Sequence, residues 1–204
     1  MKMISNRRSW ILRILVGVVV LGLLLFGMLA PSTPPLRRTS GPVPQAAYVW
    51  QRAWTDDVRA AIAEPPAGIE SFVVLAAECQ HLDGQWQTVR VAVDWRALAK
   101  KGLRVGLAIR IGAYCGPFER EDATARMIVD LARRVLAEVR SAGIEPTELQ
   151  IDFDCATARL AGYRIWVEML QAALTKGPPV TITALPTWLN SSDFEALAHS
   201  IDGL

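Results

Sequence analysis

The chain has 204 residues, of which 51% are hydrophobic and 21% charged. This composition excludes a disordered tail and a transporter with many membrane spans, and it suits one domain with an attachment. Residues 1–46 carry six basic and no acidic residues, whereas the remainder carries 16 basic and 20 acidic ones. A nucleic-acid-binding surface would concentrate positive charge on the domain itself, so the sequence predicts no nucleic-acid partner.

The first predicted element is a membrane span. Residues 14–30 contain no charge and follow a basic segment at 1–13. At ~1.5 Å per residue they cover most of a hydrocarbon core of ~30 Å. Positive charge on the amino side predicts that 1–13 are cytoplasmic and that the domain lies outside. We therefore expect a single-pass signal anchor. A cleaved signal peptide that releases a secreted domain is the alternative.

A proline-rich linker is expected at residues 31–46, ahead of a domain at 47–204. Five prolines between 31 and 45 prevent a helix or a central strand, because proline lacks the amide donor. Such a segment forms an extended spacer.

Strands and helices are predicted to alternate through the domain. Strands are expected to start near residues 48, 72, 104, 149, 180 and 201, with an extra hairpin strand at 87–94. Helices are expected after Thr55, from about Asp122 to Ala142, over Leu160–Leu174 and from a capping box at Ser192-x-x-Glu195. This repeat is typical of a parallel sheet with right-handed crossovers.

The faces of the strands favour a barrel. In residues 149–154, Leu, Ile and Phe alternate with Gln, Asp and Asp, so one face is apolar and the other polar. A barrel lumen accepts polar residues near its mouth, whereas an open sheet covered on both sides is apolar on both. A complete barrel takes ~250 residues. We therefore expect an α/β fold that is an incomplete (β/α)8 TIM-type barrel of five to six units, truncated at its end. A small open parallel sheet is the alternative.

Acidic residues at the carboxyl ends of strands are the candidate catalytic groups. Asp152 and Asp154 close one strand, where barrel enzymes hold their catalytic residues. Glu78 is a third candidate, placed inward with Val74 and Ala76 by strict alternation. Arg110 is expected on the same side. It could bind substrate or simply form an ion pair with an aspartate.

Aromatic residues supply candidate substrate contacts. Trp50, Trp54 and Trp188 follow or end predicted strands, where an indole could stack on a sugar ring, although core packing is the commoner role. Tyr163 is a further candidate, but it also fits the apolar stripe of its helix.

Cysteine and histidine positions suggest no cofactor. Cys79, Cys115 and Cys155 each follow a predicted strand, and two of them could pair in an oxidising exterior, with the pairing left open. No spacing of metal-ligand type occurs, so the sequence predicts neither a metal nor a cofactor.

Three segments resemble a bacterial family of unknown function, numbered 3142. They contain Tyr48-Val49-Trp50 within residues 47–54, Asp152-Phe153-Asp154 within 149–157 ahead of Tyr163, and Pro186-Thr187-Trp188 within 183–188. The resemblance extends from about Ala47 to the end of the chain. It implies a barrel-like fold distantly similar to glycoside hydrolases. In family 18 glycoside hydrolases the corresponding strand ends in Asp-x-Asp-x-Glu, but Ala156 stands at the Glu position here, and a methyl group cannot protonate a leaving oxygen.

Two main functions remain as expectations. The first is a glycoside-hydrolase-like enzyme tethered to the bacterial inner membrane and acting on a polysaccharide in the periplasm. The second is a saccharide-binding or structural barrel without catalysis. A metal-dependent glycosyltransferase is a weaker third reading of Asp152-x-Asp154.

Overall fold

A six-stranded, mostly parallel sheet organises the part of the chain that the computed structural model describes, residues 45–99, 103–120 and 122–204. The parallel strands, in spatial order, are β1 (Gln45–Val49), β2 (Ile69–Leu82), β4 (Arg104–Ile111), β5 (Leu149–Phe153) and β6 (Val180–Ile182). β3 (Gln85–Arg90) pairs with β2 in antiparallel orientation. The α/β class and the extra hairpin strand predicted from the sequence are thus confirmed.

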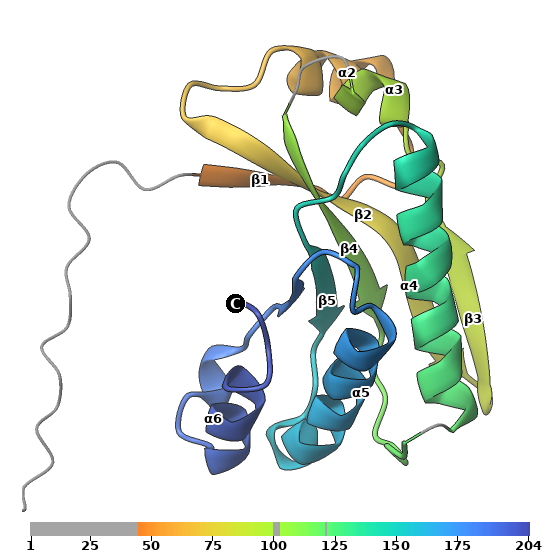
Figure 1. Ribbon diagram of the computed structural model, residues 1–204, viewed down its shortest axis with the longest axis vertical. Coiled ribbons are helices and arrows are strands. Elements are labelled where there is room, and N and C mark those ends of the chain that lie inside the picture. Colours follow the sequence, from red (N-terminus) through yellow and green to blue (C-terminus); the bar gives the residue numbers. More distant parts are fainter. Residues whose placement is uncertain (1–44, 100–102, 121) are drawn as a thin grey trace, which may run out of the picture. The chain divides into compact units, whose positions relative to one another are not determined.

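Helices cover one face of this sheet. They are α2 (Asp56–Ala63), α3 (Trp95–Ala99), α4 (Ala123–Ser141), α5 (Leu160–Ala173) and α6 (Ser192–Ala198). Figure 1 shows α4, α5 and α6 following one another along the sheet, and α5 contacts both of its neighbours. α2 and α3 lie together at the top of Figure 1, away from the ends where β4 and β5 finish.

The core lies between the sheet and the long helices. On β5, Ile151 and Phe153 are each 1% exposed. The Phe153 ring lies 5.1 Å from that of Tyr163 and 5.6 Å from that of Trp166, both on α5. The apolar stripe predicted for the 122–142 helix is buried throughout, at Ile128, Leu131, Val135 and Val139.

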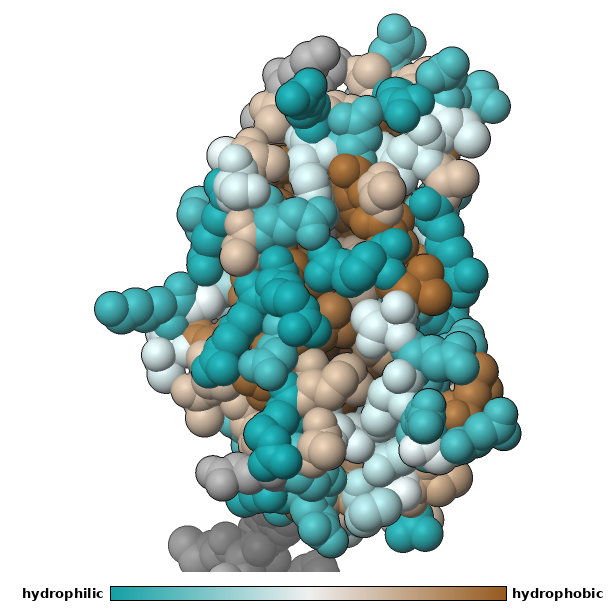
Figure 2. All heavy atoms as spheres, turned by 90° about the vertical axis from the view of Figure 1, so that its right-hand side faces the viewer, coloured by the Kyte–Doolittle hydropathy of each residue, from teal (hydrophilic) through white to brown (hydrophobic). Residues whose placement is uncertain are grey.

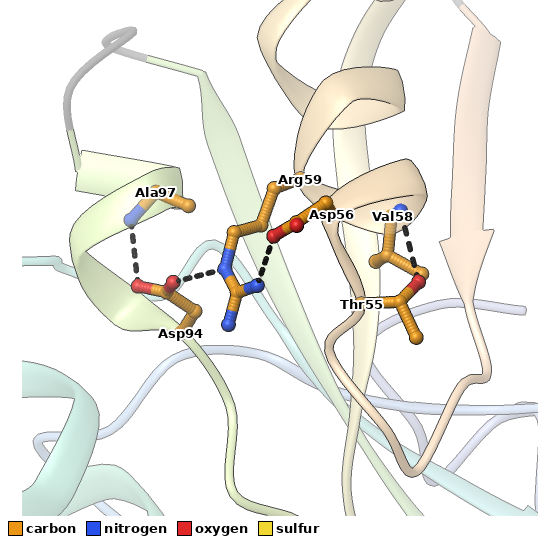
Figure 3. Close-up of polar contacts among 6 residues, drawn as sticks. All are labelled: Thr55, Asp56, Val58, Arg59, Asp94 and Ala97. Carbon is orange, nitrogen blue, oxygen red and sulfur yellow. Dashed lines mark hydrogen bonds and ion pairs between the residues drawn. The ribbon is translucent and has the colours of Figure 1, made fainter.

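Polar contacts fix the short helices α2 and α3. Thr55 caps α2, since its Oγ1 accepts from the Val58 amide at 3.4 Å. Arg59 on α2 donates to Asp94 Oδ2 at 2.8 Å, and Asp94 Oδ1 accepts from the Ala97 amide at 3.1 Å (Figure 3). One aspartate therefore both starts α3 and ties it to α2.

A closed barrel is not confirmed. The described strands form an open sheet, which fits the alternative drawn from the sequence. The strand order nevertheless follows the chain order without reversal, whereas a doubly wound sheet reverses its order. A single isolated parallel bridge joins Thr181 to Gly203 beside β6, near the position where the sequence predicted a strand to start.

The face of the sheet opposite the long helices is concave. Tyr48 on β1 donates through its hydroxyl to Gln150 Oε1 on β5 at 2.8 Å. Two strands separate β1 from β5, so a flat sheet would hold these residues about 14 Å apart. The two side chains meet because both extend across this face, and inward curvature of the sheet shortens the distance between them. Between them on β4 lie Gly106 and Ala108, which are too small to obstruct it.

The outer side of the helix layer is polar. Figure 2 shows the side on which α4 and β3 lie, where hydrophilic side chains predominate and apolar atoms appear in patches between them. Within the described ranges, no helix has the length and apolar character needed to cross a membrane. The span expected at 14–30 and nearly all of the linker expected at 31–46 lie outside those ranges.

Candidate functional site

A row of alternating charges crosses the concave face. In the strand register, Glu78 on β2 is opposite Arg110 on β4, which in turn is opposite Asp152 on β5. These are three of the residues predicted from the sequence. The row lies at the carboxyl ends of β4 and β5 and where the parallel pairing of β2 with β4 ends, on the face away from the long helices.

Asp152 is held from both sides. Thr183, just after β6, donates its hydroxyl to Asp152 Oδ1 at 2.8 Å, and Arg110 Nε lies 3.7 Å from Oδ2. The expected ion pair is therefore present. The Asp152 side chain is 15% exposed, whereas that of Arg110 is 50% exposed. The carboxylate is thus fixed in position, and the guanidinium is open to a ligand.

Glu78 reaches the row through an irregularity in β2. Val73 and Leu75 lie opposite Gly106 and Ala108, and unbroken alternation would then place Ala77, rather than Glu78, opposite Arg110. The register shifts between Leu75 and Ala77, which moves Glu78 into that position. The inward side predicted from Val74 and Ala76 was therefore wrong, although Glu78 itself does join the row.

Arg52, which follows β1, pairs with Glu78. The Glu78 side chain is 13% exposed, and that of Arg52 is 57% exposed. Each half-buried acid of the row is thus paired with a solvent-accessible arginine. The two acids and the two arginines, Glu78, Asp152, Arg52 and Arg110, together carry no net charge.

Asp154 lies beyond the strand. β5 ends at Phe153, and the Cys155 amide donates back to the Phe153 carbonyl at 2.7 Å, which makes a tight turn centred on Asp154. Strand alternation therefore sets the direction of Asp152 but not that of Asp154. Asp154 is exposed at the rim.

The predicted aromatic candidates occupy two kinds of environment. Trp50 is half-buried and stacks on Tyr48, with ring centroids 5.3 Å apart and planes 9° apart. Trp54, Trp188 and Tyr163 are buried in the core instead.

The two fully buried side chains, Tyr163 and Trp188, each donate a hydrogen bond to a backbone carbonyl inside the protein. The Tyr163 hydroxyl donates to the Ile151 carbonyl at 3.1 Å, and Trp188 Nε1 donates to the Cys155 carbonyl at 3.0 Å. The structure therefore brings Trp50, but not these rings, to the solvent-facing side of the sheet.

Sequence reasoning missed four residues of this face: Tyr48, Arg52, Gln150 and Thr183. One signal could have found two of them. Strand alternation places Tyr48 on the same face as Trp50, and Gln150 on the same face as Asp152. Thr183 and Arg52 follow strand ends, and only the observed contacts assign them.

All three cysteines are free thiols. Cys79 and Cys155 are buried, and Cys115 is exposed. Burial raises the pKa of the Cys155 thiol to about 12, and it also raises the pKa of Cys79. Among the residues that the structure describes, no group of three His, Cys, Asp or Glu side chains could hold a metal ion.

With this geometry established, comparison with known proteins shows that part of the chain is similar to a family. Residues 107–204 match the family model "Domain of unknown function (DUF3142)". The match runs from within β4 to the last residue and covers Asp152, Asp154 and Thr183, which confirms the resemblance over this segment. The β1–β2 region, with Tyr48, Trp50 and Glu78, lies outside it.

Two solved structures are similar to this chain at low sequence identity. The spore cortex-lytic enzyme SleL of Bacillus cereus is 15% identical with a TM-score of 0.51, over 77% of this chain and 38% of its own. The catalytic domain of endolysin ply40, from bacteriophage P40 of Listeria monocytogenes, is 13% identical with a TM-score of 0.45, over 64% and 59%. The chain thus spans less than two thirds of either, and the likeness to SleL concerns the fold alone. No curated protein matches the chain.

Proposed function

We propose that residues 47–204 belong to a glycoside-hydrolase-like domain that acts on a polysaccharide at the concave face. The row of Glu78, Arg110 and Asp152 carries this proposal, because it places two acids and a cation side by side at the edge where the parallel pairing of β2, β4 and β5 ends. The fold shared with a cortex-lytic enzyme supports the substrate class.

The side chains divide into distinct roles under this proposal. Asp152, fixed by Thr183 and Arg110, is the carboxylate that stabilises positive charge as it develops on the sugar ring. Asp154, exposed at the rim, is the candidate proton donor to the leaving oxygen, with Glu78 as the other candidate. The stacked pair Tyr48 and Trp50 supplies an aromatic surface for a sugar ring beside the row.

Saccharide binding without catalysis is the second candidate function. The observation that favours it is Ala156, an exposed residue at the position where family 18 glycoside hydrolases carry their acid. Asp152 is also fully engaged with protein groups. Under this alternative the same face holds a saccharide without cleaving it.

Three further features belong to the proposal. The sheet is part of a (β/α)8 barrel, which its unreversed strand order and the bridge at Gly203 support. Residues 14–30 anchor the chain in a bacterial inner membrane with the domain in the periplasm, which the basic segment at 1–13 supports. Secretion after cleavage is the alternative.

The test is an assay of the full chain on a panel of polysaccharides that includes peptidoglycan, with release of reducing ends and binding both measured. We expect Asp152→Asn and Asp154→Asn each to lower turnover by about 100-fold or more. Asp57→Asn, an exposed acid on α2, is the matched control and should leave it unchanged.

Three results of this assay separate the candidates. Binding without turnover by any version would leave the second function. Dependence on Mn²⁺ and a nucleotide-sugar would instead support the glycosyltransferase. Full activity of both Asp152→Asn and Asp154→Asn would exclude this site.

A further inference from the structure

A second concave feature lies on the other side of the molecule, between α4 and α5. It is a groove of about 440 Å³, lined by residues of both helices and by Arg120 from the preceding loop. None of its lining residues belongs to the concave face of the sheet. A role of this groove would therefore be independent of the proposed function.

The α4 wall is basic. Arg126, Val129, Asp130 and Arg133 recur at intervals of three, four and seven residues, which places them on one face of the helix. Among the residues that the structure describes, three arginines and one aspartate line the groove, which gives these lining residues a net charge of +2. One of the arginines, Arg120, also pairs with Glu168 on α5.

Arg133 on this wall remains accessible to a ligand. Arg133 Nη1 lies 3.6 Å from Asp130 Oδ1, and their side chains are 57% and 59% exposed. Exposed pairs of this kind are worth at most ~1 kcal/mol, so an incoming carboxylate can compete for the guanidinium. The planar guanidinium also suits bidentate binding of a carboxylate.

The α5 wall is apolar. Met169, Ala172 and Ala173 face the arginines at the same helical spacing, and the two alanines leave the space unfilled. Methionine adapts its shape to varied apolar partners. No aromatic residue lines the groove, so a stacked sugar ring is a poor fit. A ligand that matches both walls carries carboxylates on one side and aliphatic groups on the other.

We propose that the α4–α5 groove binds an acidic peptide segment of a partner protein, with its carboxylates on the arginines and its aliphatic side chains on Met169 and the alanines. Arginine and methionine are enriched at protein interfaces, and apolar helical segments commonly dock in grooves of this type.

The probe for the test is a fluorescein-labelled amphipathic peptide of alternating Glu and Leu pairs, titrated with the full chain and followed by anisotropy. A peptide with Lys in place of Glu is the charge control. We expect the acidic peptide to bind and the basic one not to bind. The double variant Arg126→Glu with Arg133→Glu should weaken binding by about tenfold or more, as loss of one or two charge-assisted contacts requires.

Two further variants distinguish binding in the groove from non-specific electrostatic attraction of the peptide to the protein surface. Arg134→Glu makes half of that charge change on α4, at an exposed residue outside the groove, and it should alter binding by less than about twofold. Ala172→Trp fills the groove without changing charge and should weaken binding by about tenfold. Circular dichroism of each variant confirms that the fold is retained.

Several results would overturn the proposal. These are no binding of the acidic peptide, an equal loss in Arg134→Glu, or unchanged binding in Ala172→Trp. Binding of polygalacturonate that depends on Arg126 and Arg133, with no binding of the peptide, would assign the groove to an acidic polysaccharide instead.

Discussion

Arg110 has two roles that can be measured separately: it forms an ion pair with Asp152, and it presents a positive charge to a ligand. Its contact with Asp152 is 3.7 Å long and half exposed, so it resembles a surface ion pair worth at most ~1 kcal/mol. Asp152 also keeps its hydrogen bond from Thr183. The free energy of unfolding should therefore depend little on this arginine, whereas the charge it presents to a ligand is lost when it is replaced.

Replacing Arg110 by glutamine is expected to change the free energy of unfolding by less than about 1 kcal/mol and to weaken saccharide binding several-fold. Urea denaturation and calorimetric titration measure the two effects. A loss of several kcal/mol with intact binding would mean that the pair is a structural element of the sheet.

The buried thiol of Cys155 predicts a loss of stability at alkaline pH. Its pKa rises from 9.0 to about 12 because burial disfavours the thiolate, so the folded state holds this proton more tightly than the unfolded state. The corresponding stabilisation is complete below about pH 9 and is lost as the pH rises toward 12.

Denaturation midpoints measured from pH 8 to 11 should therefore fall, and they should fall less in Cys155→Ala. In the native wild type at pH 8, a thiol reagent should modify Cys115 quickly and the two buried cysteines slowly. An equal fall of the denaturation midpoint with pH in the wild type and in Cys155→Ala would contradict this account. Rapid modification of all three thiols would also contradict it.

At the scale of elements, periodicity predicted the regular parts of the fold. The strand at Arg104–Ile111 was predicted with its observed bounds, and the helix expected at 122–142 differs by one residue at each end. Asp122 caps that helix through Oδ1, which accepts from the Ala125 amide at 2.6 Å. These elements follow the sequence because each has one consistently apolar face and a recognisable start.

Irregular elements could not be predicted in this way. The bulge in β2 shifts the faces of the strand by one residue, and nothing in the alternation of apolar residues marks it, since Phe72 to Ala77 are all buried. The capping box expected at Ser192 does not form: Ser191 is the N-cap of α6, and its side chain makes no cap hydrogen bond. The bulge depends on the pairing of β2 with β4, whereas the capping box fails because the helix begins one residue earlier than expected.

Gly162 on α5 provides a direct test of packing between elements. A Cβ built at this residue would lie 2.6 Å from the Phe118 ring, so the glycine lets Phe118 pack against the helix. Gly162→Ala should lower the free energy of unfolding by about 1–3 kcal/mol through this clash, despite the better helix propensity of alanine.

In a Phe118→Ala background the destabilisation caused by the same substitution should shrink, because the contacts at 2.6 Å with the ring are removed while the contact at 2.8 Å with the Cβ of residue 118 remains. Chemical denaturation of the four proteins gives the coupling. Purely additive effects would show that Phe118 does not pack on Gly162.

At the scale of the whole molecule, curvature is what turns a row of strand-end residues into a site. The sequence predicted that acids share one face of the strands, and the row of Glu78, Arg110 and Asp152 confirms this for two of the three. It could not show that Tyr48 reaches Gln150 across two intervening strands, because sheet curvature depends on long-range pairing. Nor did the sequence separate core aromatics from partly exposed ones, since both Trp50 and Trp188 follow or end strands but Trp50 is half-buried and Trp188 is fully buried.

The most direct test of the central claim is the dissociation constant of the saccharide selected from the panel, measured by calorimetry for the full chain and for the double variant Tyr48→Ala with Trp50→Ala. If the concave face holds the saccharide, loss of the stacked pair should raise this constant by about tenfold or more. An unchanged constant in a folded variant would contradict the placement of the ligand on this face.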